Sequence, residues 1–176
     1  CLDTQDTQEI IETVVRIAPA FGGINLEDIS APRCFEIEEA LKERLDIPVF
    51  HDDQHGTAIV VLAGVINALR LTGKKKEDCR VVVNGAGSAG IAITKLLLTY
   101  GFSHVTMCDK SGILSKGAEG LNWMQEKMMD VTNLEHKTGT LADAMKGADI
   151  FVGVSAPGIV TQDMVASMNK DAILFA

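Results

Sequence analysis

The chain has 176 residues, of which 47% are hydrophobic and 23% are charged. This composition is typical of a folded globular protein and excludes intrinsic disorder. The net charge of −8 comes from 24 acidic against 16 basic residues, and it argues against nucleic-acid binding, which requires a basic face. The most apolar stretch, residues 58–71, is interrupted by Gly64, Asn67 and Arg70, so we expect no membrane-spanning segment.

The first half of the chain predicts helices and strands in alternation. Apolar residues recur at helical spacing in three segments, and two short apolar runs between them indicate strands. In chain order we expect a helix, strand, helix, strand and helix at residues 7–18, 21–28, 32–45, 48–51 and 56–71. The last helix is apolar on nearly all sides and ends at Gly73, a pattern that predicts burial between layers.

The second half of the chain alternates more regularly. We expect strands at residues 80–84, 104–109, 149–154 and 172–176, and helices at 88–100, 120–129, 141–145 and 161–168. Such alternation predicts an α/β fold with a Rossmann-like, doubly wound parallel sheet covered by helices on both faces. The change of character near residues 52–56 places a domain boundary between residues 53 and 54.

A glycine-rich loop lies directly between a β-branched strand and an apolar helix, with the sequence Gly85-Ala86-Gly87-Ser88-Ala89-Gly90. In this motif Gly85 permits the tight turn, Gly87 lets the backbone approach a pyrophosphate, and Gly90 lets helix and strand pack closely. The helix N-terminus adds free N–H groups and a positive dipole end. We therefore predict a dinucleotide site here rather than a glycine turn without a ligand.

Asp109 ends the next strand, where a carboxylate would hydrogen-bond the adenosine ribose. This position favours NAD as the cofactor, because a carboxylate repels the extra phosphate of NADP. Lys110 is adjacent and would offset that repulsion, so NADP remains the alternative. Further along, Ser155–Gly158 follows a strand, and this loop either lines the nicotinamide side of the crevice or is a plain turn.

Two acidic pairs, Glu27-Asp28 and Asp52-Asp53, end the two short strands of the first half. If these strands lie side by side, three or four carboxylates converge, and like charges at close range need a cation to stay ionised. An oxygen-rich set suits Mg²⁺ or Mn²⁺ rather than zinc. The alternative is a helix cap, because Asp52 or Asp53 could cap the helix that begins near Gly56.

Sulfur and imidazole ligands form no recognisable metal site. The cysteines are scattered without a CxxC pair, at Cys1, Cys34, Cys79 and Cys108. We interpret them as free thiols, which favours the cytoplasm, with an organelle matrix as the alternative. His51 and His55 flank the second acidic pair, and we expect their rings to orient the carboxylates rather than bind metal.

Three longer segments, Phe21–Glu36, Ile47–Ala58 and Val81–Gly90, carry a family resemblance. Together they closely resemble malic enzymes in their bacterial-type form, and the resemblance extends over essentially the whole chain. It implies oxidative decarboxylation of malate to pyruvate and CO₂, with NAD or NADP and with Mg²⁺ or Mn²⁺. Because malic enzymes generally associate, it also implies a homo-oligomer.

The resemblance implies roles for individual residues. Glu27 and Asp28 match the family's adjacent metal ligands, and Asp53 matches its third. Asp52 would lie beside the metal without binding it, and Thr57 would open the helix that faces the cofactor. The pyrophosphate would be held by Ala86, Gly87, Ser88 and Ala89. Residues 1–53 would then end a metal- and malate-binding domain, and residues 54–176 would form an NAD(P)-binding domain truncated at its C-terminus.

The family's Lys general base and Tyr general acid lie upstream of the matching Glu-Asp motif, and none of residues 1–26 is Lys or Tyr. We therefore expect a central piece of a longer polypeptide that on its own binds metal and dinucleotide with little or no turnover. One alternative is a non-catalytic dinucleotide-binding module of the same fold. Another is a different amino-acid or hydroxy-acid dehydrogenase. Such enzymes generally need no metal, so the candidate ligands Glu27, Asp28 and Asp53 argue against this alternative.

Overall fold

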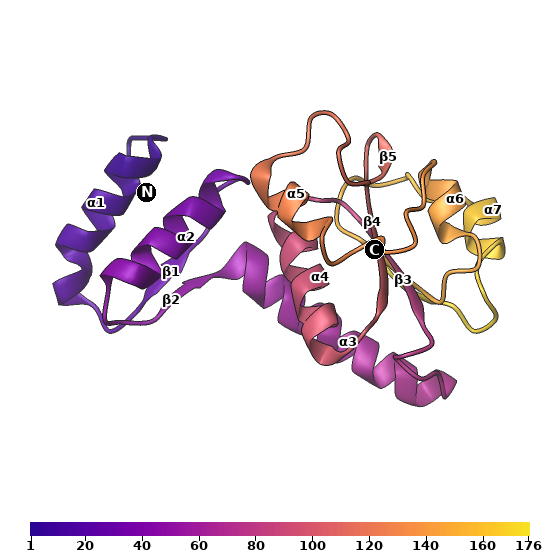
Figure 1. Ribbon diagram of the computed structural model, residues 1–176. Helices are drawn as coiled ribbons and strands as arrows, with labels where there is room; N and C mark the ends of the chain where they lie inside the picture. The colour runs from indigo at the N-terminus through magenta and orange to yellow at the C-terminus, as the bar shows by residue number, and fades with distance from the viewer.

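The computed structural model describes all of residues 1–176, in two parts joined by a long helix (Figure 1). The N-terminal part contains two helices, a short 3₁₀ turn and a two-stranded parallel ribbon: α1 (Thr7–Ile17), η1 (Ala18–Ala20), β1 (Ile24–Leu26), α2 (Arg33–Arg44) and β2 (Val49–His51). Asp6 caps α1 by accepting a 2.9 Å hydrogen bond from the backbone N–H of Glu9. The apolar stripes of α1 and α2 pack on the ribbon to form a small core.

The second part is a five-stranded sheet with the order β5-β4-β3-β6-β7. Its strands are β3 (Arg80–Asn84), β4 (His104–Asp109), β5 (Gly112–Ile113), β6 (Ile150–Gly153) and β7 (Ile173–Phe175). Its helices are α3 (Thr57–Thr72), α4 (Ser88–Tyr100), α5 (Trp123–Met128), α6 (Leu141–Met145) and α7 (Gln162–Ala166). Four strands are parallel, and only β5 pairs antiparallel, against β4.

Alternating side chains of β3 separate two hydrophobic cores. Val81 and Val83 face the core shared with α3 and α4, whereas Val82 faces the core of α6 and α7. Helices thus cover both faces of the sheet (Figure 1), which explains why the three consecutive residues Val81–Val83 in the middle of β3 are all apolar and buried. The predicted α/β fold with a doubly wound parallel sheet is confirmed. The antiparallel β5 was not predicted, because two residues carry no periodicity.

A buried carboxylate fixes the start of the central strands. Asp149, just before β6, accepts hydrogen bonds from Lys74 Nζ at 2.7 Å, the Arg80 backbone N–H at 3.0 Å and Asn169 Nδ2 at 3.1 Å. Burial alone would raise the pKa of Asp149, but these hydrogen bonds outweigh burial and lower the pKa below its ordinary value. The ionised carboxylate therefore ties together three segments that are far apart in the chain.

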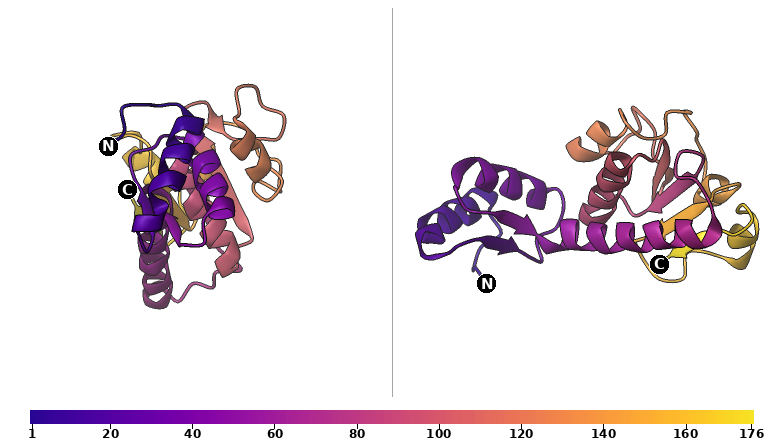
Figure 2. Two further views of the ribbon diagram at one scale, coloured as in Figure 1. Left: turned by 90° about the vertical axis from the view of Figure 1, so that its left-hand side faces the viewer. Right: turned by 90° about the horizontal axis from the view of Figure 1, so that it is seen from below.

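Helix α3 is not buried between layers, so that expectation was wrong. Only Ala58, Val65 and Leu69 are buried, while Val60 is 72% and Leu71 88% exposed. One side of the helix packs against α4 and β7, and its other side has no neighbour among residues 1–176 (Figure 2). Helix α3 therefore carries apolar residues on all its sides, but only one side is buried within this chain.

A π-helical turn, η2 (Asp52–Gly56), runs directly into α3. The continuous helical segment Asp52–Thr72 is long and apolar enough, with a mean hydropathy of 1.4, to cross a bilayer by those two measures alone. Core helices of water-soluble proteins pass the same test. The sequence pattern did not reveal that η2 lengthens this helix beyond residues 58–71. That no segment spans a membrane stays a prediction.

The two parts share a hydrophobic cluster. Cys34 and Phe35 of α2 pack with Met107 of β4 and with Met124 and Met128 of α5. The ring of Phe35 also meets the ring of Trp123 edge-on, with centroids 6.1 Å apart. Helix α2 is therefore packed against the sheet domain, and the predicted division between residues 53 and 54 stays a prediction.

Candidate active site

The glycine loop turns sharply at the carboxyl end of β3. Gly85 has a φ of 118°, in the region that favours glycine, and its N–H donates to the Cys108 carbonyl at 2.9 Å. A Cβ on Gly85 would lie 2.6 Å from the Val154 carbonyl oxygen, and one on Gly90 only 1.7 Å from the Gly85 carbonyl oxygen. The backbone packing therefore requires glycine at both positions.

Gly87 differs from its two neighbours in the motif. A Cβ on Gly87 would meet no atom within 4 Å, so the space beside it is open. Gly87 is also the N-cap of α4, where no side chain caps the first N–H groups. An open space at an uncapped helix N-terminus fits a pyrophosphate group, as the sequence predicted for the segment Ala86, Gly87, Ser88 and Ala89.

Two polar contacts that the sequence analysis missed brace this loop. Gln125 of α5 donates from Nε2 to the Ala86 carbonyl at 2.9 Å, and Asn84 Nδ2 donates to Ser155 Oγ at 2.9 Å. The pair Asn122 and Gln125 forms a capping box, which could have predicted the start of α5 but not the contact with the loop. The loop is thus held from two sides of the crevice.

Asp109 ends β4 beside the glycine loop, since the carbonyl of the preceding residue, Cys108, accepts the hydrogen bond from the Gly85 N–H. Its Oδ1 accepts hydrogen bonds from the backbone N–H and the hydroxyl of Ser111, at 2.8 and 2.7 Å. Its Oδ2 has no hydrogen-bond partner in this chain, which leaves one carboxylate oxygen for a ribose hydroxyl. Lys110 is exposed.

The loop after β6 borders the same crevice. Ser155, Ala156, Pro157 and Gly158 line a cavity of about 480 Å³ together with Asn84. This cavity lies at the carboxyl ends of β6 and β7, beside the end of β3. Ligands of doubly wound sheets bind outside the carboxyl ends of the strands, near the point where the strand order reverses, which here is between β3 and β6. The position favours a lining role for this loop over a plain turn.

The two acidic strand ends lie side by side. Strands β1 and β2 are parallel, with Leu26 opposite His51, so the two pairs of acids follow at the same edge of the ribbon. Asp53 Oδ2 accepts a 2.9 Å hydrogen bond from the backbone N–H of Asp28, whose φ of 57° marks a tight turn. The predicted neighbourhood of Asp28 and Asp53 is therefore present.

The side chains of this group do not all converge. Glu27 accepts a hydrogen bond from Asn25 at 3.1 Å, and the Asp52 carboxylate lies against Gly56. No three acidic, His or Cys side chains lie close enough together to hold a metal ion. The donor set of Glu27, Asp28 and Asp53 consists of carboxylate oxygens only, which fits Mg²⁺ or Mn²⁺.

The expectation that His51 and His55 orient these carboxylates was wrong. His55 Nε2 lies 2.6 Å from Glu38 Oε1 on α2, because the π-helical turn points residue 55 away from Asp53. His51 is fully buried, and neither of its ring nitrogens has a hydrogen-bond partner. Thr57 is the first residue of α3 and is half-buried, and its backbone N–H donates to the Asp52 carbonyl.

Comparison with known proteins identifies the family. Residues 54–173 match the family model described as malic enzyme, NAD binding domain, and residues 3–42 match malic enzyme, N-terminal domain. The chain belongs to the malic enzyme family. It is 56% identical over 176 residues to an NAD-dependent malic enzyme of Geobacillus stearothermophilus, and 50% identical over 177 residues to an NADP-dependent malic enzyme of Halomonas elongata.

Solved structures agree with this assignment. The chain superposes on the crystal structure of an NAD-dependent malic enzyme from Thermotoga maritima with a TM-score of 0.97 and 46% identity. That match covers 100% of this chain and 47% of the solved one. The chain also spans 37% and 41% of the lengths of the Geobacillus and Halomonas proteins. It therefore corresponds to less than half of these malic enzymes.

Proposed function

We propose that the chain is the central part of an NAD-linked malic enzyme, which oxidatively decarboxylates malate to pyruvate and CO₂ with a divalent metal. One observation carries the proposal: η2, which bears Asp52 and Asp53, packs against α4, which begins at the glycine loop. This contact connects a carboxylate set suited to Mg²⁺ or Mn²⁺ with a loop suited to a dinucleotide. In oxidation of a hydroxy acid followed by decarboxylation, the dinucleotide accepts the hydride and a divalent ion can polarise the substrate's oxygens.

The proposed roles follow from the family resemblance, and the shared edge of β1 and β2 supports them. Glu27, Asp28 and Asp53 hold the metal, and Asp52 lies beside it. When bound, the ion supplies Lewis-acid polarisation of the substrate's oxygens. The N-terminus of α4 binds the pyrophosphate, and Asp109 Oδ2 accepts a ribose hydroxyl, which favours NAD, with NADP as the alternative.

Proton transfer requires groups that this chain does not supply at the site. None of residues 1–26 is Lys or Tyr, and Tyr100 ends α4 far from the glycine loop, with Lys76 Nζ 4.4 Å from its ring centroid. We propose that the general base and acid lie outside residues 1–176, so that this chain alone turns over little or no malate. Malate-dependent NADH formation by residues 1–176 alone would contradict this proposal.

A second candidate is a non-catalytic dinucleotide-binding module. The observation that favours it is that no three potential ligands lie together near Asp28 and Asp53. The enzyme hypothesis differs in requiring Mn²⁺ to bind at these acids. We further propose malate and pyruvate as the small-molecule partners, assembly as a homo-oligomer, and a cytoplasmic location, with neither nucleic acid nor membrane as a partner.

The test replaces one ligand in the full-length polypeptide. We expect Asp53→Ala to abolish Mn²⁺-dependent malate oxidation, because the metal loses a carboxylate, and to leave NADH binding nearly unchanged. Asp46→Ala, at an exposed acid outside the candidate site, is the matched control and should retain activity. Turnover is followed as NADH absorbance and NADH affinity by fluorescence titration. Undiminished activity of the Asp53 variant with saturating metal would refute the metal assignment.

A further inference from the structure

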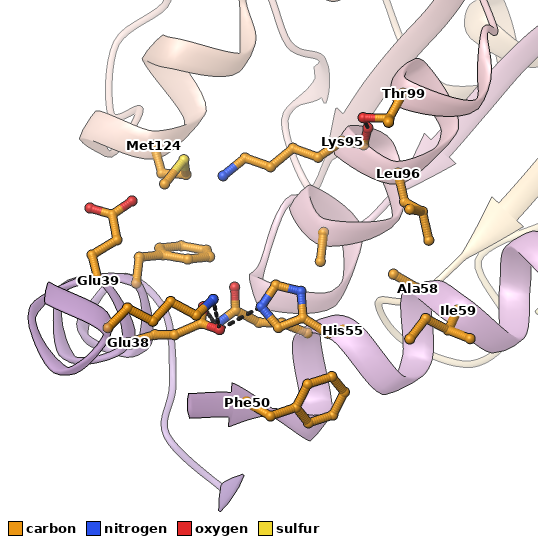
Figure 3. A pocket seen from close by; sticks show the side chains of 14 residues that line it. Glu38, Glu39, Phe50, His55, Ala58, Ile59, Lys95, Leu96, Thr99 and Met124 are labelled. Atoms are coloured by element: carbon orange, nitrogen blue, oxygen red, sulfur yellow. Dashed lines mark hydrogen bonds and ion pairs between the residues drawn. The ribbon is translucent and has the colours of Figure 1, made fainter. Parts of the chain in front are cut away.

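Glu38 is a buried carboxylate to which neither the metal nor the dinucleotide assigns a role. It lies on α2 and is 5% exposed, at one side of a cavity of about 480 Å³ between α2, η2 and α4 (Figure 3). Buried carboxylates are costly unless they are paired and hydrogen-bonded. Hydrogen bonds and ion pairs must offset the free-energy cost of burying the carboxylate. The partners of Glu38 therefore indicate its role.

Two of the three partners of Glu38 belong to η2. Its Oε1 lies 2.6 Å from His55 Nε2, and its Oε2 accepts from Gln54 Nε2 at 3.3 Å. The third partner, Lys42, is on α2 itself and donates to Oε1 at 2.7 Å. Figure 3 shows His55 extending from η2 toward Glu38. The carboxylate therefore ties the π-helical turn to α2.

The same turn is attached at a second point. Asp53, the residue before Gln54, accepts the hydrogen bond from the Asp28 backbone N–H. Asp28 in turn lies just before the turn that leads into α2. The π-helical turn is thus held by Glu38 through residues 54 and 55, and by Asp28 through residue 53. A π-helical turn often marks a functional site, and fixing it on both sides limits how its acid can move.

We propose that Glu38 is a positioning residue, which holds η2 against α2 so that Asp53 stays beside Asp28 in the place required for metal binding. This inference rests on the proposed function, since it concerns the same metal site. Glu38 itself does not touch the ion. Its effect passes through Gln54 and His55 to the backbone of η2, and thereby to the direction of the Asp53 carboxylate.

The experiment measures Mn²⁺ affinity directly, without turnover. In the full-length polypeptide, free Mn²⁺ is followed by its electron paramagnetic resonance signal in Glu38→Gln and in a matched control, Glu39→Gln. Glu39 lines the same cavity one residue further on and loses the same charge, but it makes no hydrogen bond to η2. We expect Glu38→Gln to raise the Mn²⁺ dissociation constant about tenfold and the control to leave it unchanged. NADH affinity should stay the same in both.

Three outcomes would overturn the inference. They are an unchanged Mn²⁺ affinity in Glu38→Gln, equal losses of Mn²⁺ affinity in both Gln variants, or a parallel loss of NADH affinity in a folded Glu38→Gln, which would mean that Glu38 supports the whole domain and does not position the metal site. If Glu38→Gln does not fold, Glu38→Asp takes its place, because it keeps the charge but moves the carboxylate back by one methylene. An unchanged Mn²⁺ affinity in Glu38→Asp would count equally against the proposal. Asp53→Ala is measured alongside. If Asp53→Ala retains full Mn²⁺ affinity, the proposed function fails. If Asp53→Ala loses Mn²⁺ affinity while Glu38→Gln keeps it, only the role of Glu38 is refuted.

Discussion

Alanine at Gly87 and alanine at Gly90 should both weaken dinucleotide binding, but only alanine at Gly90 should also destabilise the fold. A Cβ on Gly90 lies 1.7 Å from the Gly85 carbonyl oxygen, while carbon and oxygen approach closely at about 3.3 Å, so the loop must move by roughly 1.5 Å. Overpacking of this kind costs about 1–3 kcal/mol or more. Gly90→Ala should therefore lower both stability and NADH affinity.

Gly87→Ala should leave the fold intact. The added Cβ has no atom within 4 Å, and Gly87 has a φ of −88°, which any residue adopts. We expect a stability change within about 0.5 kcal/mol. The methyl group would occupy the space of the pyrophosphate, so the NADH dissociation constant should rise about tenfold, equivalent to about 1.4 kcal/mol.

Both variants are made in the full-length polypeptide and compared by urea unfolding and NADH fluorescence titration. Gly22→Ala, where an added Cβ also meets no atom within 4 Å and the backbone φ is not positive, is the matched control away from the site. Unchanged NADH affinity in Gly87→Ala would refute the pyrophosphate assignment. A Gly90→Ala protein with parental stability would refute the packing argument.

Two further predictions concern single carboxylates. Asp109→Ala should weaken NAD binding more than NADP binding. The ribose hydroxyl of NAD loses its hydrogen-bond acceptor, whereas for NADP the repulsion between the carboxylate and the extra phosphate disappears. Equal effects in cofactor titrations would remove the basis for preferring NAD. Asp149→Asn should destabilise the fold by about 2 kcal/mol at neutral pH, because the hydrogen bonds that Lys74 and the Arg80 N–H donate to the charged carboxylate are weakened. The pKa of Asp149 is lowered in the folded state, so its ionised carboxylate contributes to the free energy of unfolding above about pH 4. This contribution is lost as the pH falls through the lowered pKa. The free energies of unfolding of parent and variant should therefore converge at acid pH. A constant difference down to low pH would contradict this assignment.

The glycine loop and its flanking elements could be predicted closely from the sequence. The strand Arg80–Asn84, the helix Ser88–Tyr100 and the strand His104–Asp109 have the expected bounds. Their signals are local, since β-branched runs, helical periodicity and glycines act within a few residues. Short elements were less accurate: the strand expected at 21–28 contains only Ile24–Leu26.

The candidate metal site was predicted only in part. The side-by-side strand ends and the nearness of Asp28 to Asp53 followed from the two acidic pairs, but the directions of Glu27 and Asp52 did not. Side-chain directions depend on local donors such as Asn25, and on charge repulsion, which a residue pattern does not reveal. Gln125 and Glu38 were missed because their partners are far away in the sequence.

The sequence by itself determined the α/β fold, the glycine loop and the family of this chain, because each rests on contiguous motifs whose chemistry is local. Only the tertiary structure decided that η2 is a π-helical turn tied to Glu38, that His55 turns away from Asp53, and that α3 leaves one apolar side exposed. These features arise from packing between α2, η2 and α4, and hydrophobic periodicity does not specify which helix faces meet.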